Sequence, residues 1–257
     1  MRISIVSYAF YGLQRAGRMD VFGYLESVRY RYGLDAADLW NGTLASLEPD
    51  YLRKVRQALD ERELTLACLA VDGAHIWEPD PEMRERNHRN ALAHLEAAER
   101  LGARSVRIDI GGQAAEMSAE QFDVVVARYR EYAQRAHDGG YKVGPETHFG
   151  PALVPENMQR IYRAVDSPAC GIMLHVGHWV EGREDEGDRL VAPWVFHTHV
   201  DWRITTTCLA EKMAILRDAG YQGYWGVEHH SGRNEYAEVA VQVAMVRNVL
   251  DHWRTAD

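Results

Sequence analysis

The chain has 257 residues, of which 46% are apolar and 26% are charged, and its formal charge is −9. This composition is typical of an ordinary globular protein and excludes a largely disordered chain. The negative charge and the lack of a lysine- and arginine-rich block argue against a nucleic-acid surface, and no run approaches the roughly eighteen apolar residues of a membrane span.

The opening segment MRISIVSYAFYG shows neither a basic leader nor a small-residue cleavage site, so we expect a cytoplasmic protein with no membrane partner. Its three cysteines, Cys68, Cys170 and Cys208, lack C-x-x-C spacing. We therefore expect them to fill the core rather than to form disulfides or a cysteine zinc site.

Short apolar runs alternate with longer amphipathic segments along the chain. The runs predict strands over residues 2–8, 35–40, 64–71, 104–110, 141–146, 170–175, 194–200 and 223–228. Between them, helical spacing of apolar residues predicts helices over 81–101, which opens with a proline, and over 118–138, which opens with the capping sequence SAEQ. Gly102, Gly139 with Gly140, and Gly220 stand where helices are expected to end.

Repeated strand–helix units without a linker predict a parallel sheet. Because no dinucleotide-binding glycine motif follows the first strand, we expect one α/β domain over residues 1–257, a closed (β/α)₈ TIM barrel. In such a barrel the active site lies at the C-terminal ends of the strands, so polar residues at those ends are the functional candidates.

Metal-ligand residue types gather at the ends of the last four predicted strands. They are Glu146, His175, His197 and Glu228. Buried carboxylates at this position would be costly without a cation, which supports a ligand role. A mixed nitrogen and oxygen set suits Mn²⁺, Co²⁺ or Zn²⁺ better than Mg²⁺ or Ca²⁺, so we expect one such divalent ion.

Further strand-end residues are candidates for substrate contact. They are Tyr8, Trp40, His75, Arg107, His148, His178 and His199. Two-residue alternation places His199 on the face of His197, where it would contact substrate or support a ligand. Trp77 and Trp202 are added to Tyr8 and Trp40 as candidates for apolar walls against a substrate. We expect His229 in a surface loop and residues 181–189 in a solvated acidic loop.

With these residues in view, the chain resembles the sugar phosphate isomerase/epimerase superfamily, the xylose isomerase-like TIM barrels that include endonuclease IV. The resemblance rests on the order and spacing of LDAADLWNG, RNALAHLEAAERLGARSVRIDIGG and PETHFG. Members of the ketose 3-epimerase type hold one divalent metal with Glu, Asp, His and Glu, which match Glu146, His175, His197 and Glu228. His175 stands where the family has aspartate. Its imidazole makes the shell softer and leaves the reaction type open.

The resemblance implies an isomerase or epimerase that acts through an enediolate on a keto sugar or related polyol, with Glu146 and Glu228 moving the proton. It also assigns His178 and Arg203 to the substrate. A lyase using the same enolate, with His199 or His148 as the acid, is the alternative.

An endonuclease-type phosphodiesterase would need more ligands on the first strands and a basic face. A non-catalytic sugar-binding barrel is the remaining rival. The expected partner is a small carbohydrate, and the oligomeric state stays open, a homo-oligomer included.

Overall fold

The computed structural model describes residues 2–256, in which eight short strands alternate with helices. The strands are β1 (Ile3–Ile5), β2 (Ala36–Trp40), β3 (Thr65–Val71), β4 (Ser105–Ile108), β5 (Lys142–Gly144), β6 (Ile172–His175), β7 (Val195–Val200) and β8 (Trp225–Val227). Each lies inside a predicted strand. The first is shorter than predicted, because the chain turns into a 3₁₀ helix, Ser7–Phe10, directly after it.

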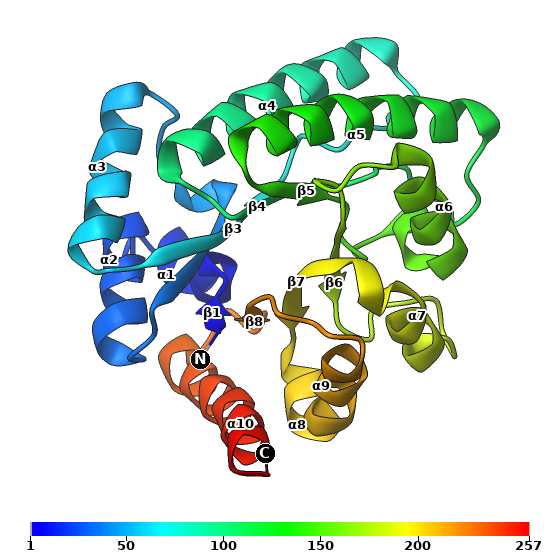
Figure 1. The fold of residues 1–257 in the computed structure, drawn as a ribbon. Helices are drawn as coiled ribbons and strands as arrows, with labels where there is room; N and C mark the ends of the chain where they lie inside the picture. The colour runs from blue at the N-terminus through cyan, green and yellow to red at the C-terminus, as the bar shows by residue number, and fades with distance from the viewer. Residues whose placement is uncertain (1, 257) are drawn as a thin grey trace.

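The strands are parallel and close into a barrel. Two ladders run β2-β3-β4-β5 and β6-β7-β8-β1. Bridges from Val6 to Asp38 and from Glu146 to Met173 join the two ladders at their edges. Figure 1 shows the helices arranged around this sheet, with the first and last parts of the chain close together. The predicted (β/α)₈ barrel is confirmed.

Helices surround the barrel on the outside. They are α1 (Tyr11–Arg15), α2 (Val21–Glu26), α3 (Pro49–Glu61), α4 (Pro81–Leu101), α5 (Ala119–Gly139), α6 (Pro155–Val165), α7 (Glu184–Val191), α8 (Trp202–Thr207), α9 (Leu209–Asp218) and α10 (Glu235–Ala256). The two helices predicted in detail are α4 and α5. Within residues 2–256, no helix is both long enough and apolar enough to span a membrane.

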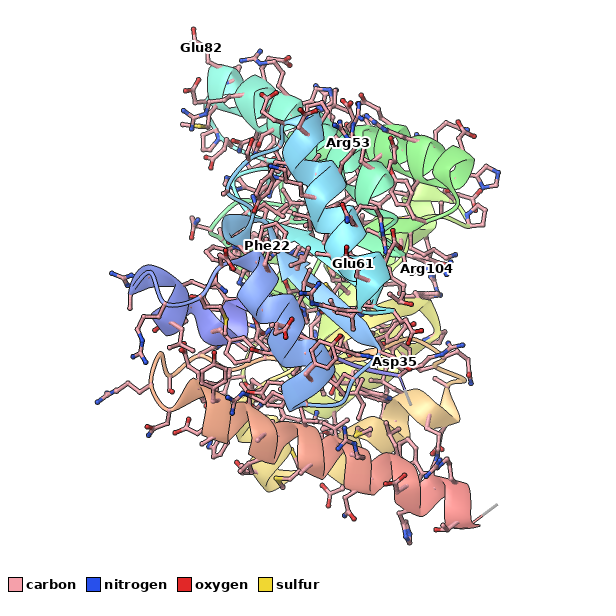
Figure 2. The ribbon with its side chains drawn as sticks, turned by 90° about the vertical axis from the view of Figure 1, so that its left-hand side faces the viewer. Phe22, Asp35, Arg53, Glu61, Glu82 and Arg104 are labelled. Carbon is pink, nitrogen blue, oxygen red and sulfur yellow. The ribbon has the colours of Figure 1, made fainter. Side chains whose placement is uncertain are left out.

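The helix ends follow from local chemistry. The Ser118 hydroxyl accepts a hydrogen bond from the Gln121 N–H and caps α5, as the SAEQ sequence predicts. Gly102 and Gly140 end α4 and α5 with φ of 68° and 72°, a left-handed conformation that glycine adopts without strain. Figure 2 shows charged side chains, including Arg53 and Glu61 on α3, on the outer surface of this helical layer.

The barrel interior is packed by side chains from opposite strands. Cys68 on β3 lies 3.8 Å from Met173 on β6, measured between the sulfur atoms. Asp38 on β2 lies 2.5 Å from His197 on β7, measured from Oδ2 to Nε2. All four residues are buried. The interior below the strand ends is therefore a filled core rather than a channel.

A buried ion pair joins the segment after β6 to α9. The Lys212 ammonium lies 2.7 Å from an Asp188 carboxylate oxygen, and Asp188 also accepts hydrogen bonds from Trp179 and Gly177. Asp188 is 1% exposed, and burial raises its pKa despite these partners. The predicted acidic loop 181–189 is thus partly wrong: from Glu184 it is helix α7, held by this ion pair.

We expect Lys212→Met to lower the free energy of unfolding by about 3–5 kcal/mol at neutral pH, because Asp188 keeps a buried charge without its cation. Without Lys212 the folded-state pKa of Asp188 rises further above its unfolded value. A carboxyl whose pKa is raised on folding stabilises the fold below its unfolded pKa and loses that contribution as the pH rises. The loss of stability caused by Lys212→Met should therefore be smaller in acid than at neutral pH. Urea denaturation at about pH 7 and about pH 4 measures this, with exposed Lys54→Met as the control. An equal loss of unfolding free energy at both pH values would contradict the role of Lys212 as the cation that compensates Asp188.

Candidate active site at the strand ends

Four side chains from the last four strands meet at the C-terminal end of the barrel. They are Glu146 after β5, His175 at the end of β6, His199 on β7 and Glu228 after β8. His175 Nδ1 lies 3.4 Å from Glu146 Oε1 and 3.4 Å from Glu228 Oε2. His199 Nδ1 lies 3.3 Å and 3.6 Å from the same two oxygens. Two imidazole nitrogens and two carboxylate oxygens thus surround one point.

The structure does not bring His197 into this group, which differs from the prediction. The ladder between β6 and β7 pairs His175 with His199 and Met173 with His197. His197 therefore faces the same interior but one layer lower, where its Nε2 contacts the buried Asp38 carboxylate at 2.5 Å. Strand register selects His199 in its place.

The charge state of the group fits a cation. Burial alone would lower the pKa of His175, but Asp201 and the two nearby carboxylates raise it to about 10. Glu228, Asp38 and Glu146 likewise raise the pKa of His199 well above its ordinary value, against the effect of burial. Conversely, burial opposes ionisation of Glu228, but His199, His230 and His175 bring its pKa to about 2. The two histidines therefore hold protons strongly beside the ionised carboxylate of Glu228. A divalent ion can take the place of these protons.

Two atoms of the group also lack a hydrogen-bond partner among the described residues. These are the buried atoms His199 Nδ1 and Glu228 Oε2. Unpaired polar atoms are costly in a protein interior, and here both are directed at the shared centre. The residues present therefore fit a divalent cation held by Glu146, His175, His199 and Glu228.

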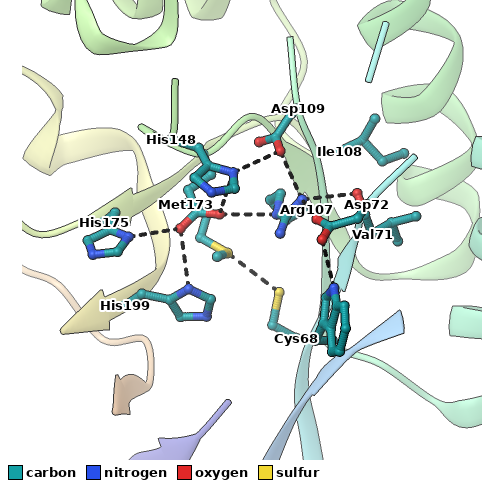
Figure 3. Close-up of polar contacts among 12 residues, drawn as sticks. Cys68, Val71, Asp72, Arg107, Ile108, Asp109, His148, Met173, His175 and His199 are labelled. Atoms are coloured by element: carbon teal, nitrogen blue, oxygen red, sulfur yellow. Dashed lines mark hydrogen bonds and ion pairs between the residues drawn. The ribbon is translucent and has the colours of Figure 1, made fainter. Parts of the chain in front are cut away.

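Arg107 on β4 is the fixed positive charge beside this group. Its guanidinium Nη1 lies 2.8 Å from Asp72 Oδ1 and 2.9 Å from Asp109 Oδ2, and its Nε lies 3.1 Å from Glu146 Oε2. His148 approaches the same carboxylates, with Nδ1 3.1 Å from Asp109 Oδ2. Figure 3 shows Arg107 between Asp72 and Asp109, with His148 alongside. Asp109, Glu146 and His148 have the spacing of a metal site, but the guanidinium already compensates their charge.

We expect Arg107→Met to lower the free energy of unfolding by about 3–5 kcal/mol in the metal-free protein, since it leaves Asp109 and Glu146 buried without their cation. Chemical denaturation at neutral pH measures this loss. Arg104→Met, at an exposed position just before β4, serves as the control and should change stability by no more than about 0.5 kcal/mol. Equal effects of the two substitutions would show that Arg107 does not compensate these carboxylates.

A cavity of about 320 Å³ opens over the four-residue group. Its lining consists of Val6, Tyr8, Trp40, Ala70, Asp72, Arg107, His148, His175, His178, His199, Glu228 and His230. Tyr8 supplies one wall, with its ring centroid 5.1 Å from that of Trp40 and 5.6 Å from that of His230. The volume is at the small end for ligand pockets, and the lining combines aromatic faces with titratable groups.

Several predicted substrate contacts lie at this cavity and others do not. Tyr8, Trp40, Arg107, His148, His178 and His199 line it. His75 does not line it and instead contacts Glu78, while the exposed Arg203 extends to the backbone oxygen of Gly177. His75 follows its strand in a loop and Arg203 lies at the start of helix α8, so strand alternation sets the direction of neither side chain. Neither residue is among those that line this cavity, and their contact with a substrate stays a prediction.

The aromatic residues beyond Tyr8 and Trp40 are also placed differently from the prediction. Trp77 stacks with the Arg84 guanidinium, and Trp202 packs against His229. His229, predicted in a surface loop, is 2% exposed and contacts Glu238 at 2.9 Å. None of these residues lines the cavity.

Three residues of the site were not assigned from the sequence. His230 lines the cavity and places Nε2 3.2 Å from Glu228 Oε1; the same two-residue alternation that relates it to Glu228 could have found it. Asp201 approaches His175 Nε2 at 3.9 Å. Asp38 contacts His199 Nε2 at 3.2 Å. Asp38 contacts His199 across the barrel, and Asp201 lies just past the end of β7. The pattern of residues along a single strand reveals neither contact.

Comparison with solved structures finds the same fold in an epimerase, in a probable dehydratase and in a magnesium complex. D-psicose 3-epimerase with D-tagatose from Clostridium cellulolyticum H10 is 15% identical, with 99% of each chain covered and a TM-score of 0.76. The probable 3-DHS dehydratase of petrobactin synthesis from Bacillus anthracis is 15% identical, with 96% of this chain and 99% of that chain covered and a TM-score of 0.74.

A third structure is a xylose isomerase-like TIM barrel protein from Mycobacterium smegmatis in complex with magnesium. It is 17% identical, with 90% of this chain and 89% of that chain covered and a TM-score of 0.72. At these identities the likeness concerns the fold. No curated protein matches the chain.

The sequence itself matches a family model. The model described as xylose isomerase-like TIM barrel covers residues 30–249, which includes seven of the eight strands and all four residues of the central group. The chain therefore belongs to the xylose isomerase-like TIM barrel family.

Proposed function

We propose that this protein is a divalent-metal-dependent isomerase or epimerase acting on a keto sugar or a related polyol through an enediolate. The observation that carries this proposal is the convergence of Glu146, His175, His199 and Glu228 beneath a cavity at the strand ends. The likeness in fold to a D-psicose 3-epimerase supports it.

The mixed set of two carboxylates and two imidazoles suits Mn²⁺, Co²⁺ or Zn²⁺. Magnesium is kept as a candidate because the Mycobacterium smegmatis structure is described as a magnesium complex. A bound cation would stabilise the negative charge that develops on neighbouring substrate oxygens when a carbon-bound proton leaves.

The two glutamates are the proposed proton carriers. Each has one oxygen directed at the centre and the other toward a positively charged or protonatable partner: Glu146 Oε2 toward Arg107 and Glu228 Oε1 toward His230. These partners favour the ionised carboxylate, which is the form that accepts a proton. One glutamate would remove the proton and the other would return it on the opposite face of the enediolate.

A lyase is the second candidate, and the histidines of the cavity favour it. Burial and the neighbouring His175 and His148 lower the pKa of His178, whereas Asp109 and Glu146 raise that of His148 against its burial. His148 is therefore suited to donate a proton to a leaving group from an enolate. The dehydratase among the structures of like fold supports keeping this alternative.

The test is incubation of the purified protein with keto sugars and keto glycosides in D₂O, with Mn²⁺, Co²⁺, Zn²⁺ or Mg²⁺ supplied separately. Proton NMR should show deuterium entering the carbon next to the carbonyl. Product analysis then separates an epimer from an elimination product. Absence of both exchange and product with every metal, together with absence of metal binding, would reject the proposal in favour of a non-catalytic barrel.

A further inference from the structure

Asp38 on β2 lies below the four-residue group and contacts it from the interior of the barrel. Its side chain is fully buried, and it does not line the cavity. Its Oδ2 is 2.5 Å from His197 Nε2 and 3.2 Å from His199 Nε2. One carboxylate oxygen thus joins the histidine that lies outside the central group to the histidine that lies within it.

The contact determines which nitrogen of His199 faces the centre. An ionised carboxylate only accepts hydrogen bonds, so a neutral His199 that bonds to Asp38 carries its proton on Nε2. Its Nδ1 then keeps a free lone pair, and this is the atom that lies 3.3 Å from Glu146 Oε1 and 3.6 Å from Glu228 Oε2. The geometry therefore presents Nδ1, and not Nε2, as the ligating atom.

The surrounding backbone holds Asp38 in place. Its own N–H donates to the Tyr24 hydroxyl at 2.9 Å, and Tyr24 is fully buried. On the other side, β8 passes so close that a Cβ at Gly226 would lie 3.1 Å from Asp38 Oδ2 and 2.4 Å from the Thr198 carbonyl oxygen. Glycine at position 226 therefore leaves the space in which the carboxylate reaches His199.

We infer that Asp38 is a positioning residue for the metal centre: it fixes the tautomer and ring orientation of His199, with His197 as a second donor that orients the carboxylate. This inference rests on the proposed function, because it concerns delivery of Nδ1 to a cation. It also gives His197 a role that its position outside the central group leaves unexplained. Carboxylates that accept from the far nitrogen of a ligating histidine commonly tune metal affinity.

The test compares Mn²⁺ binding by wild type, Asp38→Asn and Cys68→Ala, measured by isothermal titration calorimetry. Asparagine keeps the size of the side chain, but its neutral amide oxygen is a weaker acceptor than the charged carboxylate oxygen that both imidazoles contact, so it holds the two imidazole protons less strongly. We expect its Kd for Mn²⁺ to rise about 10- to 100-fold. Cys68 lies in the same buried interior and contacts Met173, so Cys68→Ala controls for a change in packing and should leave the Kd unchanged.

The outcomes separate this inference from the proposed function. If wild type and Asp38→Asn bind Mn²⁺ with the same Kd, the role of Asp38 is overturned while the metal enzyme stands. If wild type binds no divalent ion, the proposed function falls and the inference falls with it. Should Asp38→Asn fail to fold, ¹⁵N NMR of zinc-loaded wild type decides: a proton on His199 Nε2 is expected, and a proton on Nδ1 would overturn the inference.

Discussion

Glu228→Gln should slow solvent-deuterium exchange into a bound keto sugar by about 10²- to 10⁴-fold, the usual contribution of a positioned acid or base. Glutamine keeps the volume of the side chain but cannot accept the carbon-bound proton. Glu228 Oε2 lies 3.4 Å from His175 Nδ1, and its Oε1 lies 3.2 Å from His230 Nε2. The substitution therefore changes charge at the centre and at the cavity wall together.

Glu146→Gln should have an effect of the same size, since Glu146 is the second proposed proton carrier. Proton NMR in D₂O measures both rates, and calorimetry on the same samples shows how much Mn²⁺ each variant still binds. Glu131→Gln, at an exposed carboxylate on α5, is the matched control. Exchange at the wild-type rate in both glutamine variants at the cavity would refute the mechanism with two carboxylates.

Removing divalent ions with EDTA should abolish this exchange and lower the melting temperature, and readdition of Mn²⁺ should restore both. A ligand that binds only the folded state adds about 4 kcal/mol when its free concentration is 1,000 times Kd. The physical reason lies in the site itself, where the buried atoms His199 Nδ1 and Glu228 Oε2 find no hydrogen-bond partner within residues 2–256. Differential scanning calorimetry with and without Mn²⁺ measures the shift.

Two histidine variants sharpen this prediction. His199→Ala should lose the stabilisation by Mn²⁺ altogether. His197→Ala should be less stable but keep an increase in melting temperature with Mn²⁺, because His197 contacts Asp38 and not the two glutamates. The reverse order, with His197 required and His199 dispensable, would restore the ligand set expected from the sequence and reject the one drawn from the structure.

The fold could be predicted because each strand and several helix ends carry their own local signals. Apolar runs mark all eight strands, and Gly102 and Gly140 end their helices with the positive φ that glycine tolerates. The architecture follows from repetition of the unit. The acidic segment from residue 181 was less predictable, because α7 depends on a contact between Asp188 and Lys212 that joins distant parts of the chain.

The site was predictable only as far as strand alternation reaches. It brings Glu146, His175 and Glu228 to the strand ends, and the structure places their side chains around one point. Alternation places His197 and His199 on the same face of the sheet, but it does not show which of them lies level with His175. That depends on the register between β6 and β7. The contact of Asp38 with His199 crosses the barrel, and only the closed sheet reveals it.

The most direct test of this account is a crystal structure of the protein grown with Mn²⁺, with anomalous diffraction recorded to locate the ion. We expect one anomalous peak enclosed by Glu146 Oε1, His175 Nδ1, His199 Nδ1 and Glu228 Oε2. A peak among Asp38, Cys68 and His197, whose ligand atoms also have the spacing of a metal site, would contradict the account, as would the absence of any peak at the strand ends.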